Sequence, residues 1–164
     1  MEAYLIRHGI AAERRNYNND EQRPLIAKGR KKTLMVAQSL VARGLELDLI
    51  LTSPLVRAAQ TAEIFQQAGL TKKVETCAFL KPEGVIFEWL EWLERYQPNH
   101  SETKIALVGH QPNLGNWAEM LLWGTPKGQI RVKKAGIIGL KIPSVGTPIA
   151  RSTLFLQTAP KWLV

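Results

Sequence analysis

Arg7, His8 and Gly9 are the first residues of this sequence whose types and spacing indicate chemistry, and they follow directly on an apolar run. A guanidinium group can hold an anion, and an imidazole can attack an electrophile. The glycine lets the backbone turn away and approach a ligand closely. An apolar run that ends in such residues is typical of a buried strand whose last residues reach the rim of a sheet.

Two later stretches of the sequence carry matching chemistry. Ser53 and Pro54 follow a second apolar run, and Arg57 comes one helical turn further on. His110 follows a third apolar run, directly after Gly109. Ligands of α/β sheets lie outside the carboxyl ends of the parallel strands. If the three runs are parallel strands, all of these side chains therefore meet at one edge of the sheet.

Together these side chains suit a phosphoryl group. Arg7 and Arg57 supply forked donors that match phosphate oxygens, and the helices expected after Ser53 and His110 add N–H groups and a positive dipole end. Charge repulsion from the arginines favours a neutral, nucleophilic His8, whereas the second histidine would become a cation beside a bound dianion. We expect no cofactor and no metal, because the sequence has no Cys/His cluster and few carboxylates near these motifs.

Each of these residues alone has an ordinary structural interpretation. An arginine at a strand end, such as Arg7, is often only a solvated charge, and Arg57 on the first turns of a helix is more often exposed than catalytic. A histidine before a helix, such as His110, is usually a cap or a packing residue. His100 lies in a polar loop and is expected to be inert. The functional interpretation therefore depends on the joint arrangement.

Length and composition limit the classes of protein to consider. The chain has 164 residues, 45% of them hydrophobic, which suits one globular domain over residues 1–164. No apolar run reaches the ~20 residues of a membrane helix, and no secretory signal is recognisable. Cys77 is the single cysteine, which suits a reducing compartment. We therefore expect a cytoplasmic protein without membrane association.

The net charge of +8, from 22 basic and 14 acidic residues, favours acidic partners such as phosphorylated molecules. The same charge is equally consistent with plain solubility. The basic residues are scattered in pairs and triples, and no long basic stripe with interleaved aromatic residues is present. We therefore do not expect nucleic-acid binding.

Strands alternating with helices predict an α/β sheet with helices on both faces. The apolar faces of three predicted helices should point at this sheet, including Leu34, Ala37 and Val41 of the helix over 27–43 and Trp89 of the helix over 85–96. The polar segment 10–24 should lie over or beside the Arg-His-Gly turn. In chain order, we expect strands over residues 2–7, 47–51, 73–78, 104–108, 129–142 and 149–157, and helices over 27–43, from Ser53-Pro54 to 67, over 85–96 and from Pro112 to 123.

The sequence resembles the histidine phosphatase superfamily, also called the phosphoglycerate-mutase-like fold. Arg7-His8-Gly9 resembles its defining motif, the run from Ser53 to Ala62 its second arginine motif, and Gly109-His110 its second histidine. The resemblance implies a three-layer sandwich with a mostly parallel sheet of about six strands, one of them antiparallel. It also implies that His8 is the nucleophile and becomes a phosphohistidine. Arg7, Arg57 and His110 would then hold the phosphoryl oxygens.

Within the superfamily, the chain is most similar to the small SixA-type phosphohistidine phosphatases. Its short length, Arg23-Pro24-Leu25 with Gly29 following, and Gly109-His110-Gln111-Pro112 carry this likeness. The likeness implies that Arg23 joins the residues that hold the phosphoryl oxygens. Gly9, Ser53 and Glu83 complete the candidate substrate-binding residues, and we expect a phosphate ion to bind at this site.

The sequence departs from the larger superfamily members at one point that affects substrate choice. Those members carry an acidic general acid after the third strand, where the nearby candidate here is Glu83. A carboxylate stabilised by the start of a helix is the simpler interpretation of that residue. A missing acid favours a P–N substrate, because an imidazole with a conjugate-acid pKa near 6.5 can leave without one.

Only a short segment separates the third and fourth predicted strands, which leaves little chain for a lid over the site. An open site suits a phosphohistidine on the surface of another protein better than a small metabolite. We therefore expect a phosphatase acting on a phosphohistidine-bearing signalling protein, such as a phosphotransfer domain of a phosphorelay. The alternatives are a small-molecule or phosphoserine/threonine phosphomonoesterase on the same fold, and a catalytically inactive phospho-binding protein.

Overall fold

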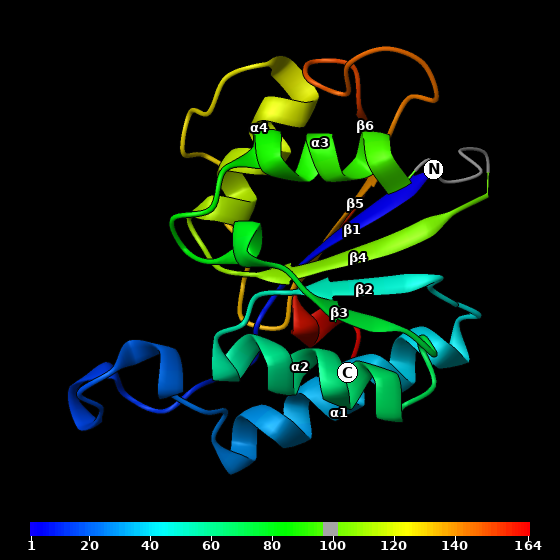
Figure 1. Cartoon of the computed structure of the whole chain (residues 1–164). Helices are drawn as coiled ribbons and strands as arrows, with labels where there is room; N and C mark the ends of the chain where they lie inside the picture. The colour runs from blue at the N-terminus through cyan, green and yellow to red at the C-terminus, as the bar shows by residue number, and fades with distance from the viewer. Residues whose placement is uncertain (97–101) are drawn as a thin grey trace.

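A six-stranded sheet in the strand order β3-β2-β4-β1-β5-β6 forms the centre of the molecule (Figure 1). The computed structural model describes residues 1–96 and 102–164, so His100 lies outside the described residues. The strands are β1 (Glu2–Arg7), β2 (Leu49–Thr52), β3 (Val74–Thr76), β4 (Lys104–Gly109), β5 (Ile137–Lys141) and β6 (Thr153–Thr158). The helices are α1 (Ala27–Ala42), α2 (Val56–Gln67), α3 (Ile86–Tyr96) and α4 (Asn113–Trp123), with short 3-10 turns η1 (Arg14–Asn16), η2 (Asp20–Gln22), η3 (Ala78–Leu80) and η4 (Pro160–Trp162).

The strand directions confirm the predicted fold class. β1, β2, β3 and β4 pair in parallel, whereas β5 runs antiparallel to both of its neighbours. The parallel register of β1 and β4 sets Arg7 opposite Gly109. The residues that follow these two, including both candidate histidines, therefore leave the sheet at the same edge.

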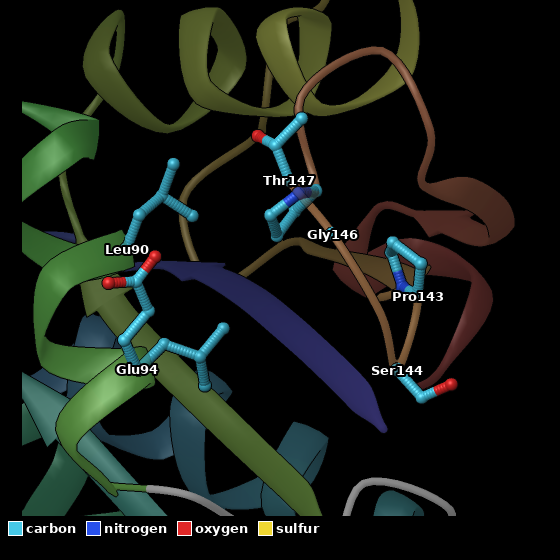
Figure 2. Close-up of a pocket in the computed structure, with 8 residues that line it drawn as sticks. Leu90, Glu94, Pro143, Ser144, Gly146 and Thr147 are labelled. Atoms are coloured by element: carbon cyan, nitrogen blue, oxygen red, sulfur yellow. The ribbon is translucent and has the colours of Figure 1, made fainter.

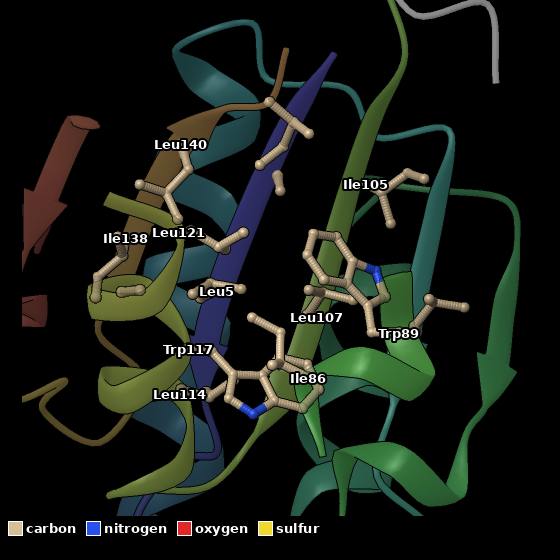
Figure 3. Close-up of a cluster of buried hydrophobic side chains, with 14 of the residues drawn as sticks. Leu5, Ile86, Trp89, Ile105, Leu107, Leu114, Trp117, Leu121, Ile138 and Leu140 are labelled. Carbon is tan, nitrogen blue, oxygen red and sulfur yellow. The ribbon is translucent and has the colours of Figure 1, made fainter. Parts of the chain in front are cut away.

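Alternation along the strands explains why helices cover both faces. Leu5 and Leu107 face α3 and α4, whereas Ile6 and Val108 face α1 and α2. Figure 3 shows the first of these two cores, where Trp89 of α3 packs near α4 and the sheet. Trp89 and Trp117 stack with ring centroids 6.2 Å apart and are almost fully buried, as predicted for core tryptophans. Figure 1 shows the same three layers, with α1 and α2 on one side of the sheet.

The predicted apolar face of α1 is partly wrong. Ala37 is buried, but Leu34 and Val41 are 39% and 38% exposed. Apart from Leu40, the buried face instead consists of small and β-branched residues, and the N-terminal part of α1 lies close to the chain that leaves β1. A Cβ on Gly29 would collide with the carbonyl oxygen of Ile10, so glycine permits this close approach. The buried residues of α1 are Gly29, Thr33, Val36, Ala37 and Leu40.

Two predicted boundaries are also wrong. The second helix begins at Val56, so Ser53 is not its cap and Pro54 is not its first residue. The strand predicted over 129–142 covers only Ile137–Lys141. Part of the reason is the buried carboxylate of Glu119, which accepts backbone N–H groups from residues 127–130. Those N–H groups are bound to a side chain and are not available to a sheet ladder.

Candidate active site

Both candidate histidines lie side by side at the carboxyl edge of the sheet. His8 directly follows β1 and His110 directly follows β4, and their ring centroids are 5.2 Å apart. Arg57, in the first turn of α2, donates from Nε to His8 Nε2 at 3.3 Å. All three side chains are buried. With Arg7 they form what we call the cradle: Arg7, His8, Arg57 and His110.

Hydrogen bonds fix which ring nitrogen of His8 carries the proton. His8 Nδ1 lies 2.8 Å from the carbonyl oxygen of Gly9, which can only accept. Nδ1 therefore carries the hydrogen, and Nε2 keeps a lone pair, as its contact with the Arg57 N–H also requires. This is the tautomer that a nucleophilic histidine needs, with the attacking atom on the side of the arginine.

The other two cradle residues, Arg7 and His110, each hold a buried nitrogen that has no partner among the described residues. His110 Nε2 lies 2.9 Å from Ser53 Oγ, while its buried Nδ1 makes no hydrogen bond. Arg7 donates from Nη1 to the carbonyl oxygen of Val132 at 3.0 Å, and its buried Nε is unpaired. Arg7 Nε is a donor, and His110 Nδ1 becomes one when the ring is protonated, so both nitrogens can donate to the oxygens of an incoming anion.

Asp20 belongs to the site, although sequence reasoning missed it. Its carboxylate accepts from Arg57 Nη2 at 2.9 Å and from Arg23 Nε at 2.9 Å, and its backbone carbonyl accepts from Arg57 Nη1 at 2.8 Å. Arg23 is thereby linked to the cradle through a shared carboxylate. Although burial acts in the opposite direction, the hydrogen bond from Arg23 and the charge of Arg57 lower the pKa of Asp20. Asp20 is therefore ionised at neutral pH and orients the two arginines.

The structure places two other candidate residues differently from expectation. Gly9 has no left-handed backbone angle, and its N–H donates to Thr61 Oγ1 at 3.0 Å. A Cβ there would collide with Thr33 of α1, so helix packing requires the glycine. Glu83 is exposed and makes no hydrogen bond or ion pair within residues 1–96 and 102–164. The structure thus brings together the cradle with Ser53, and Arg23 through Asp20, but not Glu83.

Comparisons with known proteins agree with this geometry. A profile of the histidine phosphatase superfamily (branch 1) matches residues 3–81. The phosphohistidine phosphatase SixA of Escherichia coli is 27% identical over 122 residues, which is 70% of each chain. The structure of the protein histidine phosphatase SixA complexed with tungstate superposes with a TM-score of 0.85 at 25% identity, over 100% of both chains. An uncharacterized protein of Picosynechococcus sp. is 47% identical, over 100% of this chain and 99% of its own.

The chain belongs to the histidine phosphatase superfamily. Its SixA-type likeness extends over the whole fold, and membership supports phosphatase activity. Gln60 and Thr61 lie three and four residues after Arg57, in the part of the histidine phosphatase motif that follows the arginine. Gln60 Oε1 accepts the N–H of Leu25 at 2.8 Å, and Thr61 Oγ1 accepts the N–H of Gly9 at 3.0 Å. These bonds tie the segment after the nucleophile to α2.

The loop that carries Val132 is held in place by the residue after the second histidine. Gln111 donates from Nε2 to the carbonyl of Ile130 and accepts at Oε1 from the N–H of Val132, both at 3.1 Å. The Val132 carbonyl in turn accepts from Arg7. Gln111 therefore positions Arg7 of this histidine phosphatase through the backbone of residues 130–132. In the sequence, the feature that could have indicated this role is the position of Gln111 in the Gly-His-Gln-Pro run.

Burial lowers the pKa of both histidines in the unliganded histidine phosphatase. The pKa of His8 falls to about 2, chiefly through burial, with added repulsion from His110, Arg57 and Arg7. Burial and the charge of Arg57 lower the pKa of His110 to about 3. The predicted repulsion from the arginines is therefore present, but loss of water is the larger cause. Both rings are neutral at physiological pH until an anion arrives.

We expect neither of these two rings to titrate between pH 8 and pH 5 in the unliganded protein. The unfolded chain binds protons below pH 6.5 that the folded chain does not, so stability falls as pH drops, by about 2 kcal/mol per histidine between pH 7 and pH 5. Tungstate should raise both pKa values by supplying a nearby negative charge. Histidine NMR shifts and urea unfolding would measure this, with His8→Ala assigning the resonances. Titration of either ring near pH 6.5 would contradict the buried geometry.

A separate cavity of about 440 Å³ lies at the opposite edge of the sheet (Figure 2). Its walls come from α3 and from residues 143–148 after β5, and β5 ends opposite the first residue of β1. Glu94 is the one charged residue among its lining side chains. No cradle residue lines this cavity, so it is separate from the histidine phosphatase chemistry.

No group of three or more histidine, cysteine, aspartate or glutamate side chains is placed to hold a metal ion within residues 1–96 and 102–164. In the same part of the chain, no helix combines the length and apolar character needed to cross a bilayer.

Proposed function

We propose that this histidine phosphatase removes the phosphoryl group from a phosphohistidine on another protein, a phosphorelay or signalling protein, through a transient phosphohistidine on His8. The observation that carries the proposal is the set of arginine contacts to the carboxylate at the cradle. Asp20 is the carboxylate bonded to the cradle among the described residues, and it forms ion pairs with Arg14, Arg23 and Arg57. Against the effect of burial, the hydrogen bond from Arg23 and the charge of Arg57 lower the pKa of Asp20, so the carboxylate is ionised. An ionised carboxylate cannot supply the proton that an alcohol leaving group needs.

In the first step, His8 Nε2 attacks the phosphorus and the P–N bond to the substrate imidazole breaks. The departing nitrogen keeps the electron pair, and the substrate ring leaves neutral because its other nitrogen already carries a proton. Arg7, Arg57 and the second histidine stabilise the charge on the phosphoryl oxygens. The His8 ring, phosphorylated at Nε2 and protonated at Nδ1 against the Gly9 carbonyl, is then cationic.

In the second step, water attacks the phosphorus of the phosphoenzyme. The bond to Nε2 breaks, the electron pair returns to that nitrogen, and His8 leaves as a neutral ring with its proton still on Nδ1. Both hydrogens of the water leave with the product as dihydrogen phosphate, which loses one to solvent. Neither step requires a protein acid, because each leaving group is an imidazole with a conjugate-acid pKa near 6.5.

One contact favours a second candidate function, hydrolysis of a phosphomonoester of a small molecule or of phosphoserine or phosphothreonine. Asn113, the first residue of α4, donates from Nδ2 to the carbonyls of Lys81 and Gly84 at 3.3 and 3.1 Å. These two hydrogen bonds lie on either side of Glu83 in the sequence and attach its segment to α4, the helix that follows His110. A rotation of the Glu83 side chain toward the cradle would supply an acid for a P–O leaving group.

A substrate panel distinguishes these functions. We expect the wild-type enzyme to hydrolyse a protein chemically phosphorylated on histidine at least about 10²-fold faster than a phosphoserine peptide or an alkyl phosphate. A factor of this size is the rate that a reaction with an alcohol leaving group loses when the general acid is missing. Glu83→Gln should leave phosphohistidine turnover within about twofold of the wild type. The matched control Glu91→Gln, on the exposed face of α3, should do the same.

Two results would overturn the proposal in different ways. Comparable turnover of the alkyl phosphate, or loss of turnover in Glu83→Gln alone, would assign the enzyme to P–O substrates. Binding of phosphohistidine protein with no phosphoenzyme and no release of phosphate would identify a catalytically inactive phospho-binding protein.

A further inference from the structure

One flank of the cradle is bordered by unpaired cations from three separate parts of the chain. A hollow of about 470 Å³ opens beside Arg7 and is lined by lysines of α1, of the segment before β5 and of η4. A second hollow of about 430 Å³ shares Arg7 with the first and adds Arg131. We define the basic face as Arg7, Lys32, Arg131, Lys133, Lys134 and Lys161.

Two of the three segments, α1 and the segment before β5, contact the chain around the nucleophile. The N–H of Ala135, next to Lys134, donates to the carbonyls of Arg7 and His8 at 3.0 and 3.2 Å. The residue after Lys32 packs against Gly9. Lys32 and Lys134 are therefore held close to the site of phosphoryl transfer, and Lys161 lines the same hollow as Arg7.

The two sides of the site differ in how their charges are compensated. On the side of η1 and η2, the basic residues have acidic partners, as Arg23 has in Asp20 and Lys81 has in Glu21 at 2.9 Å. On the basic face, no lysine has an ion pair within residues 1–96 and 102–164, and no acidic residue lines either hollow. The basic face thus places positive charge beside the cradle without an acidic partner among the described residues.

We propose that the basic face docks the acidic surface of the phosphorylated protein substrate. This inference rests on the proposed function, since it names the surface of the partner next to the phosphohistidine. The face mixes cations with apolar surface, because Ile10 and Pro160 line the same hollow and the side chain of Trp162 is exposed. Lys161 Nζ lies 4.9 Å from the Trp162 ring centroid. Exposed tryptophan among basic groups is typical of a protein interface.

The test compares two small proteins of similar size, one acidic and one basic, each phosphorylated on histidine with phosphoramidate. The test variant is Lys32→Gln/Lys134→Gln/Lys161→Gln, with one lysine from each segment. The control has the same loss of charge at the opposite edge of the sheet, Lys72→Gln/Lys104→Gln/Lys141→Gln. Each is assayed for kcat/KM at low and high salt, and on p-nitrophenyl phosphate.

We expect the test variant to lose about tenfold in kcat/KM on the acidic protein at low salt, because docking charges raise the association rate. High salt should remove most of the difference between it and the wild type. The basic protein and p-nitrophenyl phosphate should be hydrolysed at wild-type rates by both variants, and the control variant should match the wild type on the acidic protein.

Equal loss in the test and control variants would show an effect of net charge alone and overturn the docking proposal, as would an unchanged test variant. Salt-sensitive binding of duplex DNA that the test variant loses, with kinetics on the acidic protein unchanged, would assign the face to nucleic acid. None of these three results contradicts the proposed function. If the wild type hydrolyses neither phosphohistidine protein, the proposed substrate is wrong and the docking surface fails with it.

Discussion

Replacing His8 by alanine is expected to abolish turnover, by more than about 10⁴-fold, and to leave no covalent phosphoenzyme. His8 supplies the lone pair that attacks phosphorus, and its Nδ1 proton is held by the Gly9 carbonyl so that Nε2 is free. Intact-protein mass spectrometry after rapid quenching at neutral or alkaline pH, where a phosphohistidine survives, would measure the phosphoenzyme directly.

The control for this variant is His110→Ala, which removes a charge-stabilising group and keeps the nucleophile. It should lose about 10²-fold in turnover and still form a phosphoenzyme, slowly. Thermal unfolding of both variants shows whether the fold survives, and tungstate binding shows whether the cradle does. A fully active His8→Ala enzyme, or a phosphoryl group found on the second histidine, would contradict the mechanism.

Arg57→Ala is expected to lower kcat/KM by about 10²–10³-fold, with most of the loss in kcat. Its guanidinium joins the nucleophile to Asp20, with contacts of 3.3 Å to His8 Nε2 and 2.9 Å to the carboxylate. Truncation removes a donor to the phosphoryl oxygens and leaves the negative charge of Asp20 beside the site with one arginine fewer. Steady-state kinetics on a phosphohistidine protein and on p-nitrophenyl phosphate would measure the effect on both substrates.

Arg57→Lys separates charge from geometry at the same position. Lysine keeps the charge but not the planar fork, so it should recover only part of the lost activity. Arg95→Ala, at the exposed end of α3, is the matched control and should stay within twofold of the wild type. Wild-type kinetics in Arg57→Ala would show that this arginine is a structural partner of Asp20 alone.

Local patterns in the chain were enough to predict the order of strands and helices and three of the motifs that meet at the site. Arg7-His8, Arg57 and His110 each stand beside a strand end or a helix start, and those signals are read within a few residues. Because parallel strands end at one edge, the meeting of the two histidines also followed from the order of the elements. The roles of these residues in catalysis stay predictions until the variants are measured.

Contacts between distant segments could not be predicted in this way. Asp20 stands in a polar loop with nothing in its neighbours to mark it, and only the packing of η2 against α2 brings it to an arginine 37 residues away. The buried face of α1 was misjudged for the same reason, since hydrophobicity favoured Leu34 whereas close approach of the backbone selected Gly29.

The chain alone therefore specified which chemical groups are available and at which strand ends they stand, because strand and helix preferences act over short distances along the backbone. Only the tertiary structure showed which hydrogen bonds each histidine ring makes and which carboxylate binds the arginines. It also showed that Glu83 is exposed and not bonded to the cradle within the described residues. Those features depend on hydrogen bonds and burial between residues remote in sequence, and their energies exist only when the segments have packed together.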